Sequence, residues 1–179
     1  MTDRETLRYI RDHYGDFLVK AGETWGVRYA VLAGIMMRET RGGLSPLLSI
    51  PGPGGKGDKD KNGIYHGHGL MQIDNRSFPA FCSGYSWSSP EANINFGAEV
   101  LYRKIKFFAR RLDHLELLEG WDLERLGIAS YNAGEGNVLK AVNRGIEPDL
   151  KTARGDYSRK VLGYAALYMG LPVRPPEAV

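Results

Sequence analysis

Apolar side chains recur every three or four residues along most of the chain, which is the period of an amphipathic α-helix. Within the first 25 residues, the repeating apolar positions are Leu7, Ile10, Tyr14, Phe17 and Ala21. We therefore expect one or two helices over residues 1–25, with a break near Gly15 because glycine is a poor helix former. Thr2 and Glu5 have the spacing of a capping box, so the first helix should begin beside them.

The same period continues along the later chain and predicts five more helices. They are expected over residues 29–40, 90–111, 122–131, 138–144 and 156–169. In the longest of these, Ser89 is the expected N-cap and Pro90 the first helical residue, where its missing N–H is not needed. Asp156 is the expected cap of the last helix. Strand-like alternation is scarce, so the sequence predicts an all-α, or mainly α, fold.

The segment over residues 45–69, SPLLSIPGPGGKGDKDKNGIYHGHG, breaks this helical pattern. It is dense in glycine and proline and longer than an ordinary connection between helices. One interpretation is a disordered linker between two domains. The helices that follow are too few for a second core, so we expect instead a single domain over residues 1–179. In that domain the segment would form an ordered functional loop over a cleft.

Composition supports a globular protein and limits its partners. The chain has 179 residues, 42% of them hydrophobic and 11% aromatic, which suffices for a core without disulfides or metal ions. Its one cysteine, Cys82, has no partner for an internal disulfide. The net charge of +3 is small and no run of lysine and arginine follows one face, so nucleic-acid binding is not expected. We expect a monomer.

No part of the chain has the length and apolar character of a membrane span, which needs about 18 apolar residues. The N-terminus is charged from its first turn and lacks the apolar core of a signal peptide. We therefore expect either a mature chain or one that other proteins release, as with a phage endolysin or tail enzyme. The cellular location stays open.

Glu39 has an unusual setting, in the stretch MMRETRGG at the end of the helix expected over residues 29–40. Its neighbours on the same helical face are all apolar, namely Val31, Leu32, Ile35 and Met36. Burial and the negative end of the helix dipole both disfavour the ionised form, so the pKa of Glu39 should be raised. A carboxyl group that keeps its proton near neutral pH suits a general acid. The alternative is an ion pair with Arg38, Arg41 or Arg103.

Four motifs in this order resemble those of the goose-type lysozymes and, more distantly, of the soluble lytic transglycosylases. They are MMRETRGG at residues 36–43, GHGLMQIDNRS at 67–77, GIASYNAGEGNV at 127–138 and DYSRKV at 156–161. The resemblance spans about residues 14–169 and implies a lysozyme-like fold. It implies a muramidase that cleaves β-1,4 bonds between N-acetylated sugars of cell-wall peptidoglycan, with Glu39 as catalytic acid. Thr40 stands where serine is usual, and Phe78 where a histidine is frequent.

The resemblance also assigns residues to the substrate cleft. The implied substrate-binding residues are Gly69, Met71, Gln72, Tyr131, Asn132 and Tyr157. The first three belong to GLMQ, whose backbone groups and glutamine line the cleft in the family, although Leu70 and Met71 are also candidates for the core. The tyrosine and asparagine of SYNAG would reach toward the sugar near the scissile bond. The tyrosine of DYSRKV would lie near the acid.

The identity of the second carboxylate decides the mechanism. Asp74 matches an aspartate that goose-type lysozymes have and lytic transglycosylases generally lack, so the resemblance implies inverting hydrolysis with Asp74 as the base. The alternative for Asp74 is a cap or an ion pair with Arg76. A further family aspartate aligns with Gly63, and the loop offers Asp60, or else Asp58, as the catalytic candidate in its place.

Three alternatives keep the sugar-binding cleft. Without a base, the substrate itself would attack and leave a 1,6-anhydro sugar, as in the transglycosylases. A chitinase is a second alternative, because chitin and peptidoglycan both present N-acetylglucosamine. A non-catalytic sugar-binding module is the third, and in that case Glu39 would be dispensable.

Metal and thiol chemistry are not expected. Residues 58–63, DKDKNG, match the first half of a calcium loop, but Gly69 occupies the twelfth position, where a glutamate is needed. His66 and His68 lack the third ligand nearby that a zinc amidase would need. Cys82 lies in no motif of a cysteine peptidase. The sequence therefore predicts an enzyme without metal or cofactor.

Overall fold

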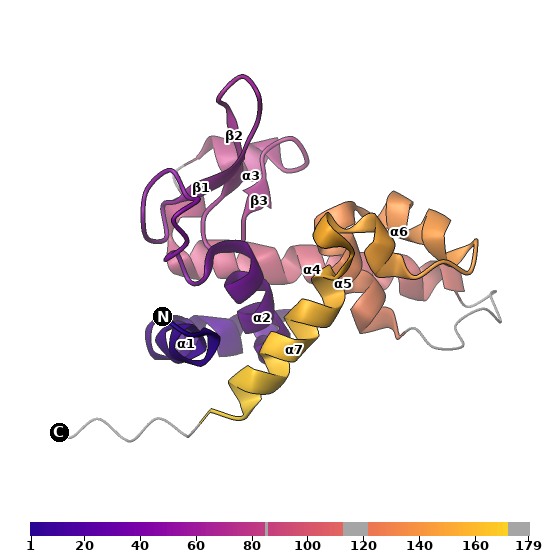
Figure 1. Ribbon diagram of the computed structural model, residues 1–179, viewed down its shortest axis with the longest axis horizontal. Helices are drawn as coiled ribbons and strands as arrows, with labels where there is room; N and C mark the ends of the chain where they lie inside the picture. The colour runs from indigo at the N-terminus through magenta and orange to yellow at the C-terminus, as the bar shows by residue number, and fades with distance from the viewer. Residues whose placement is uncertain (85, 113–121, 172–179) are drawn as a thin grey trace.

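The computed structural model of the protein describes residues 1–84, 86–112 and 122–171. Within them the α-helices are α1 (Asp3–Trp25), α2 (Tyr29–Thr40), α3 (Pro79–Ser83), α4 (Pro90–Leu112), α5 (Leu123–Ala133), α6 (Glu135–Val142) and α7 (Tyr157–Met169). The strands are β1 (Lys56–Lys59), β2 (Tyr65–His68) and β3 (Ile73–Asp74), and the 3-10 helices are η1 (Ser86–Ser88), η2 (Pro148–Lys151) and η3 (Ala153–Gly155). The fold is mainly α, which confirms the predicted class (Figure 1).

Helix α1 begins at the predicted capping box but is not interrupted. The Glu5 amide donates to Thr2 Oγ1 at 3.2 Å, and the Thr2 amide donates to Glu5 Oε2 at 2.7 Å. The break expected near Gly15 is wrong, because α1 continues to Trp25. A glycine inside a helix costs only about 0.5–1 kcal/mol, and burial of Leu18, beyond the glycine, outweighs that cost.

Three further details correct the helix predictions. Helix α3 was not expected, and α6 begins at Glu135 instead of Val138, directly after Gly134. Asp156 precedes α7, but its side chain does not cap the helix and pairs with Arg38 instead. The N-cap expected at Ser89 is confirmed by the Ala92 amide, which donates to Ser89 Oγ at 3.4 Å.

The segment over residues 45–69, expected as a loop, contributes two strands to a small antiparallel sheet of order β1-β2-β3. Gly57 of β1 is opposite Gly67 of β2, which in turn is opposite Asp74 of β3. A Cβ atom at Gly57 or at Gly67 would lie 2.3 Å from Gln72 Oε1. The glycines that gave this segment the composition of a loop are therefore needed so that the Gln72 side chain can pack against the strands.

Helix α2 lies at the centre of the core, with nine of its twelve residues buried. It packs against α1 and α7, and Gly34 permits the contact with α7, because a Cβ atom there would lie 2.4 Å from the Val161 carbonyl oxygen. Figure 1 shows the sheet and α3 on one side of the molecule and α5 with α6 on the other. A second apolar cluster, formed by Phe108, Leu126, Ala129, Val138 and Val142, joins α4, α5 and α6.

None of the described helices combines the length and the apolar character that crossing a membrane requires.

We expect Gly34→Ala to lower the free energy of unfolding by about 1–3 kcal/mol, the usual cost of overpacking a core. The added methyl group would meet the α7 backbone, which has no flexible end that could move aside. Urea denaturation followed by circular dichroism measures the change. Gly163→Ala is the matched control, because Gly163 is exposed on α7 and nothing lies within 4 Å of its added Cβ. Equal stability of the two variants would contradict the close α2–α7 approach.

Candidate active site

Glu39 lies in the last turn of α2, partly exposed, and receives a hydrogen bond from the Tyr157 hydroxyl. Burial raises the pKa of Glu39 to about 7, against the opposing effects of that hydrogen bond and of the Arg38 charge. The ion pairs considered for Glu39 do not form among the described residues. Arg38 pairs with Asp156, Arg41 with Asp3 and Arg103 with Glu99. The apolar face of α2 therefore ends in a carboxyl group that is half protonated near neutral pH.

Tyr157, the first residue of α7, is almost fully buried, and it is among the residues that line a cavity beside Glu39. Burial, followed by the proximity of Glu39, raises the pKa of Tyr157 well above its ordinary value. Its hydroxyl therefore keeps its proton and remains a hydrogen-bond donor. The Tyr157 side chain therefore positions the Glu39 carboxyl group, and the substrate-binding role that the resemblance implies for Tyr157 stays a prediction.

Asp74 ends β3 and forms an ion pair with Arg76, as one of the alternatives predicts. Its carboxylate accepts the Arg76 amide at 2.8 Å, the guanidinium Nε at 3.0 Å and Nη2 at 2.9 Å. Partial burial raises the pKa of Asp74, but the side-chain and backbone hydrogen bonds from Arg76 outweigh this, and the pKa lies below its ordinary value. Asp74 is therefore an anion at neutral pH, beside the same cleft as Glu39.

The loop carboxylate in the cleft is Asp58 and not Asp60. Arg76 Nη2 also contacts Asp58 Oδ2 at 2.6 Å, so one guanidinium joins Asp58 and Asp74. The negative charge of Asp58 also contributes to the raised pKa of Glu39. Asp60 turns into the β1–β2 hairpin, where it accepts two backbone amides, at 2.8 and 2.9 Å, and contacts His66 at 3.3 Å. The predicted candidate Asp60 is thus held by its own turn, outside the cleft lining.

These contacts also bear on the metal and thiol alternatives. The described residues contain no group of three histidine, cysteine, aspartate or glutamate side chains arranged to hold a metal ion. His68 is buried, with its ring against Trp87 and its Nδ1 atom 2.9 Å from the His66 carbonyl oxygen. Burial raises the pKa of the Cys82 thiol to about 11, so this thiol is not activated as a nucleophile.

The GLMQ turn is anchored to α4 by Asn93, a buried residue that was not among the candidates from the sequence. Its side chain accepts the Met71 amide at 2.8 Å and donates to the carbonyl oxygens of His68 at 3.0 Å and Trp87 at 2.9 Å. Gly69 is required here because a Cβ atom would lie 2.3 Å from Asn93 Nδ2. The sequence did contain a signal for this role, because Asn93 is a polar residue on the otherwise apolar face of the helix expected over residues 90–111.

Side chains of the GLMQ turn divide between core and cleft. Leu70 and Met71 are fully buried, so Met71 offers the cleft only backbone atoms and is not a side-chain contact. Gln72 lines the cleft in a left-handed backbone conformation (φ 48°), and its Nε2 donates to the Gly69 carbonyl oxygen at 2.8 Å. The turn is tied to α2 through Thr40, whose hydroxyl donates to the Leu70 carbonyl oxygen at 2.8 Å.

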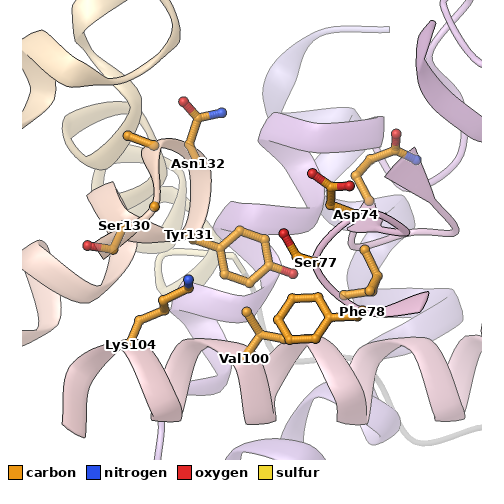
Figure 2. Close-up of a pocket in the computed structure, with 12 residues that line it drawn as sticks. Asp74, Ser77, Phe78, Val100, Lys104, Ser130, Tyr131 and Asn132 are labelled. Atoms are coloured by element: carbon orange, nitrogen blue, oxygen red, sulfur yellow. The ribbon is translucent and has the colours of Figure 1, made fainter. Parts of the chain in front are cut away.

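The end of α5 supplies the opposite wall. The Tyr131 hydroxyl donates to the Met71 carbonyl oxygen at 3.0 Å, across the cleft, and Asn132 Oδ1 accepts the Ala153 amide at 2.8 Å. Figure 2 shows Asp74 and Phe78 facing Tyr131 and Asn132, with side chains of α4 below them. Tyr131 and Asn132 both line the cavity that Glu39 borders, and both brace neighbouring segments, while their contact with a sugar stays a prediction.

Three adjoining cavities make up the cleft. The inner cavity, about 240 Å³, is lined by residues that include Asp74, Ser77, Phe78, Val100, Lys104 and Tyr131. The central cavity, about 330 Å³, includes Glu39, Asp58, Gln72, Asp74, Arg76 and Asn132. The arginine cavity, about 410 Å³, includes Arg38, Glu39, Arg41, Leu47, Arg154 and Tyr164. The central cavity shares four lining residues with each of the other two, which have only Asn132 in common, so it lies between them. Glu39 lines both the central and the arginine cavities.

Comparisons with known proteins agree with this geometry. A family model described as "Lysozyme g" matches residues 3–170. Lysozyme g of Epinephelus coioides is 33% identical over 162 residues, which cover 88% of this chain and 75% of the relative. Lysozyme G of Dromaius novaehollandiae is 33% identical over 160 residues (88% and 66%), and lysozyme g of Casuarius casuarius is 32% identical over 160 residues (88% and 73%). The predicted resemblance is confirmed, and the chain belongs to the lysozyme g family.

Proposed function

We propose that this protein is a muramidase that hydrolyses the β-1,4 bonds between N-acetylated sugars of bacterial peptidoglycan, with Glu39 as general acid. One observation supports it most directly. A carboxyl group with its pKa raised to about 7 borders a cleft whose other two carboxylates share Arg76. Two titratable groups with pKa values pushed apart are the usual arrangement of an acid and a base in one site. Membership of the lysozyme g family makes the protein a glycosidase.

Glu39 acts by donating its proton to the oxygen of the leaving sugar as the glycosidic bond breaks. Its proton is retained near neutral pH because burial disfavours the anion. The Tyr157 hydroxyl fixes the carboxyl group from the side of the core and then stabilises the carboxylate that forms after proton transfer. The two residues come from different helices, so the packing of α2 on α7 sets the direction of the acid.

Asp74 acts as the base that removes a proton from the attacking water, and Asp58 helps to hold that water. Both line the central cavity, Asp74 has a lowered pKa, and Arg76 holds the two side chains together through an ion pair with each. Attack by water from the face opposite the acid inverts the anomeric carbon. Anions so placed also favour hydrolysis over the anhydro-forming route of the transglycosylases, which needs no base.

The chain of cavities suits a linear glycan. A site that binds sugar rings on both sides of the acid needs polar groups that form hydrogen bonds with hydroxyl and N-acetyl groups. Gln72 and Asn132 supply such groups in the central cavity, and the inner cavity adds the hydroxyl of Ser77 beside the apolar Phe78. Because peptidoglycan is the polymer of the bacterial cell wall, an enzyme with this substrate acts at the cell wall.

Replacement of Glu39 by glutamine should abolish nearly all cleavage of purified peptidoglycan, a loss of at least about 10²–10⁴-fold, because the amide cannot transfer a proton. The release of reducing ends measures turnover, and mass spectrometry of the products reports the bond that is cut. Circular dichroism should be unchanged because the two side chains have the same shape. Substantial turnover by a folded Glu39→Gln variant would exclude Glu39 as the acid. Faster cleavage of a chitin oligomer than of peptidoglycan by the native enzyme would instead favour the chitinase alternative.

The pH profile of kcat/KM should fall above a pKa of about 7, as Glu39 loses its proton, and fall at low pH only below the ordinary range of an aspartate, as Asp74 gains one. The Tyr157 hydrogen bond lowers the pKa of Glu39. Tyr157→Phe should therefore move the alkaline limb to higher pH and leave the acidic limb in place. Movement of the alkaline limb to lower pH would show that the hydroxyl stabilises the protonated acid instead.

Asparagine substitutions should rank the three aspartates. Asp74→Asn should slow turnover by about 10²–10⁴-fold, the usual range for loss of a general base. Asp58→Asn should slow it by about tenfold, through one lost hydrogen bond to a charged group. Asp60→Asn is the matched control in the neighbouring turn and should stay within about twofold. Proton NMR of early products should show the α-anomer, whereas early β-anomer or anhydro ends would contradict the inverting mechanism.

A further inference from the structure

The arginine cavity carries a charge that cleavage of a neutral sugar chain does not require. Three guanidinium groups line it, from Arg38, Arg41 and Arg154. Glu39 is the only carboxyl group among its described lining residues, and that group is the acid, with its pKa raised to about 7. The cavity is therefore a cationic compartment directly beside the reacting bond.

Most of the positive charge along the cleft is neutralised within the protein. Five cationic side chains line the three cavities in the described part of the chain, and four of them have carboxylate partners. The pairs are Arg76 with Asp58 and Asp74, Lys104 with Glu135, Arg38 with Asp156, and Arg41 with Asp3. Arg154 is exposed and has no ion-pair or hydrogen-bond partner for its side chain among the residues that the structure describes. Among the cleft residues that the structure describes, the guanidinium without a partner is thus that of Arg154.

The backbone presents Arg154 in a conformation that side chains seldom adopt. Its φ and ψ are 66° and 6°, in the left-handed region, inside η3. For a residue other than glycine, this conformation persists only where neighbouring contacts determine it. Asn132 provides such a contact, by accepting the amide of the preceding Ala153 at 2.8 Å. The cleft wall itself therefore holds the segment that carries the free guanidinium.

Leu47 gives the same cavity an exposed apolar contact. It lies between α2 and β1, lines both the central and the arginine cavities, and is 83% exposed. A leucine left in water at the rim of a cleft contributes to binding when a ligand covers it, since apolar surface is then removed from water. A ligand group that satisfies both Leu47 and Arg154 would carry a methyl group and an anion.

We propose that the arginine cavity binds the carboxylate-bearing substituent on O3 of muramic acid, with Arg154 pairing with the carboxylate and Leu47 contacting the methyl group. This inference rests on the proposed function. The substituent is a lactyl ether, which ends in its own carboxylate or continues into a peptide stem that carries carboxylates. Both sources present the same chemistry to a guanidinium, which binds carboxylates through two parallel hydrogen bonds. Chitin has only a hydroxyl at this position, so Arg154 would give no advantage there.

The test compares the native enzyme with Arg154→Asn. Asparagine tolerates the left-handed conformation, so the segment keeps its backbone while the charge is removed. Lys151→Asn is the matched control, because this substitution also removes one positive charge. Lys151 is exposed, three residues before Arg154, and does not line the arginine cavity. The substrates are phosphate-free peptidoglycan with its peptide stems, and the same glycan after an amidase has removed the stems. Each is used with free carboxylates and with those groups converted to amides.

We expect Arg154→Asn to lower kcat/KM by about tenfold on carboxylate-bearing glycan, mainly through KM, and to leave the amidated glycan unchanged, as the loss of one charge-assisted pair predicts. A loss confined to the stem-bearing glycan would identify a peptide carboxylate as the bound group, and a loss confined to the stem-free glycan would identify the lactyl carboxylate. A loss on both glycans would show that the cavity accepts either carboxylate. An equal loss on free and amidated glycan, or no loss on either, would overturn the inference. An equal effect of Lys151→Asn would do the same. If the native enzyme cleaves none of these glycans, it is the proposed function that fails.

Discussion

The close packing of α2 against α7 is the contact on which the site depends. It requires Gly34, because any side chain there would meet the Val161 carbonyl oxygen. The same contact brings Glu39 from the end of one helix to Tyr157 at the start of the other. The same packing shields the Glu39 carboxyl group from water, and this burial is the largest cause of the raised pKa of Glu39. The raised pKa of Glu39 is thus a consequence of core packing.

The two sides of the cleft are built by different means. Glu39, the proposed acid, is supplied by a helix of the core, where low polarity favours a neutral carboxyl group. Asp58 and Asp74 are supplied by short strands, and hydrogen bonds from Arg76 hold the pKa of Asp74 below its ordinary value. One protein thereby keeps a carboxyl group with a raised pKa and another with a lowered pKa beside one cavity. Thr40 and Tyr131 connect the two sides by donating to carbonyl oxygens of the GLMQ turn.

The sequence predicted most of the helices and the raised pKa of Glu39, because both depend on periodic burial, which a linear pattern records. Glu39 could be identified because its four neighbours on one helical face are apolar. The sheet was missed because Gly57 and Gly67 serve the packing of Gln72, a contact between segments that composition alone presents as a loop. Asp58 and Asp60 are two positions apart in one short segment, so the sequence could not tell which of them lines the cleft. The structure shows that Asp60 is bound by backbone amides of its own turn, whereas Asp58 lines the central cavity. Tyr157 was located beside the acid, but its burial follows only from the position of α7.

The anchoring of the GLMQ turn by Asn93 has a consequence for the order in which the molecule assembles. The Asn93 amide bonds to three residues that lie 6, 22 and 25 positions away in the chain, Trp87 in one segment and Met71 and His68 in the turn itself. Loops must close before such contacts form, so they arise later than the local contacts of helices. The helices should therefore form while the substrate cleft is still open and unshaped. A chain that has lost this single amide would then keep a helical far-ultraviolet spectrum and yet lack an ordered cleft, so that helix content is a poor measure of whether this enzyme has reached its working state.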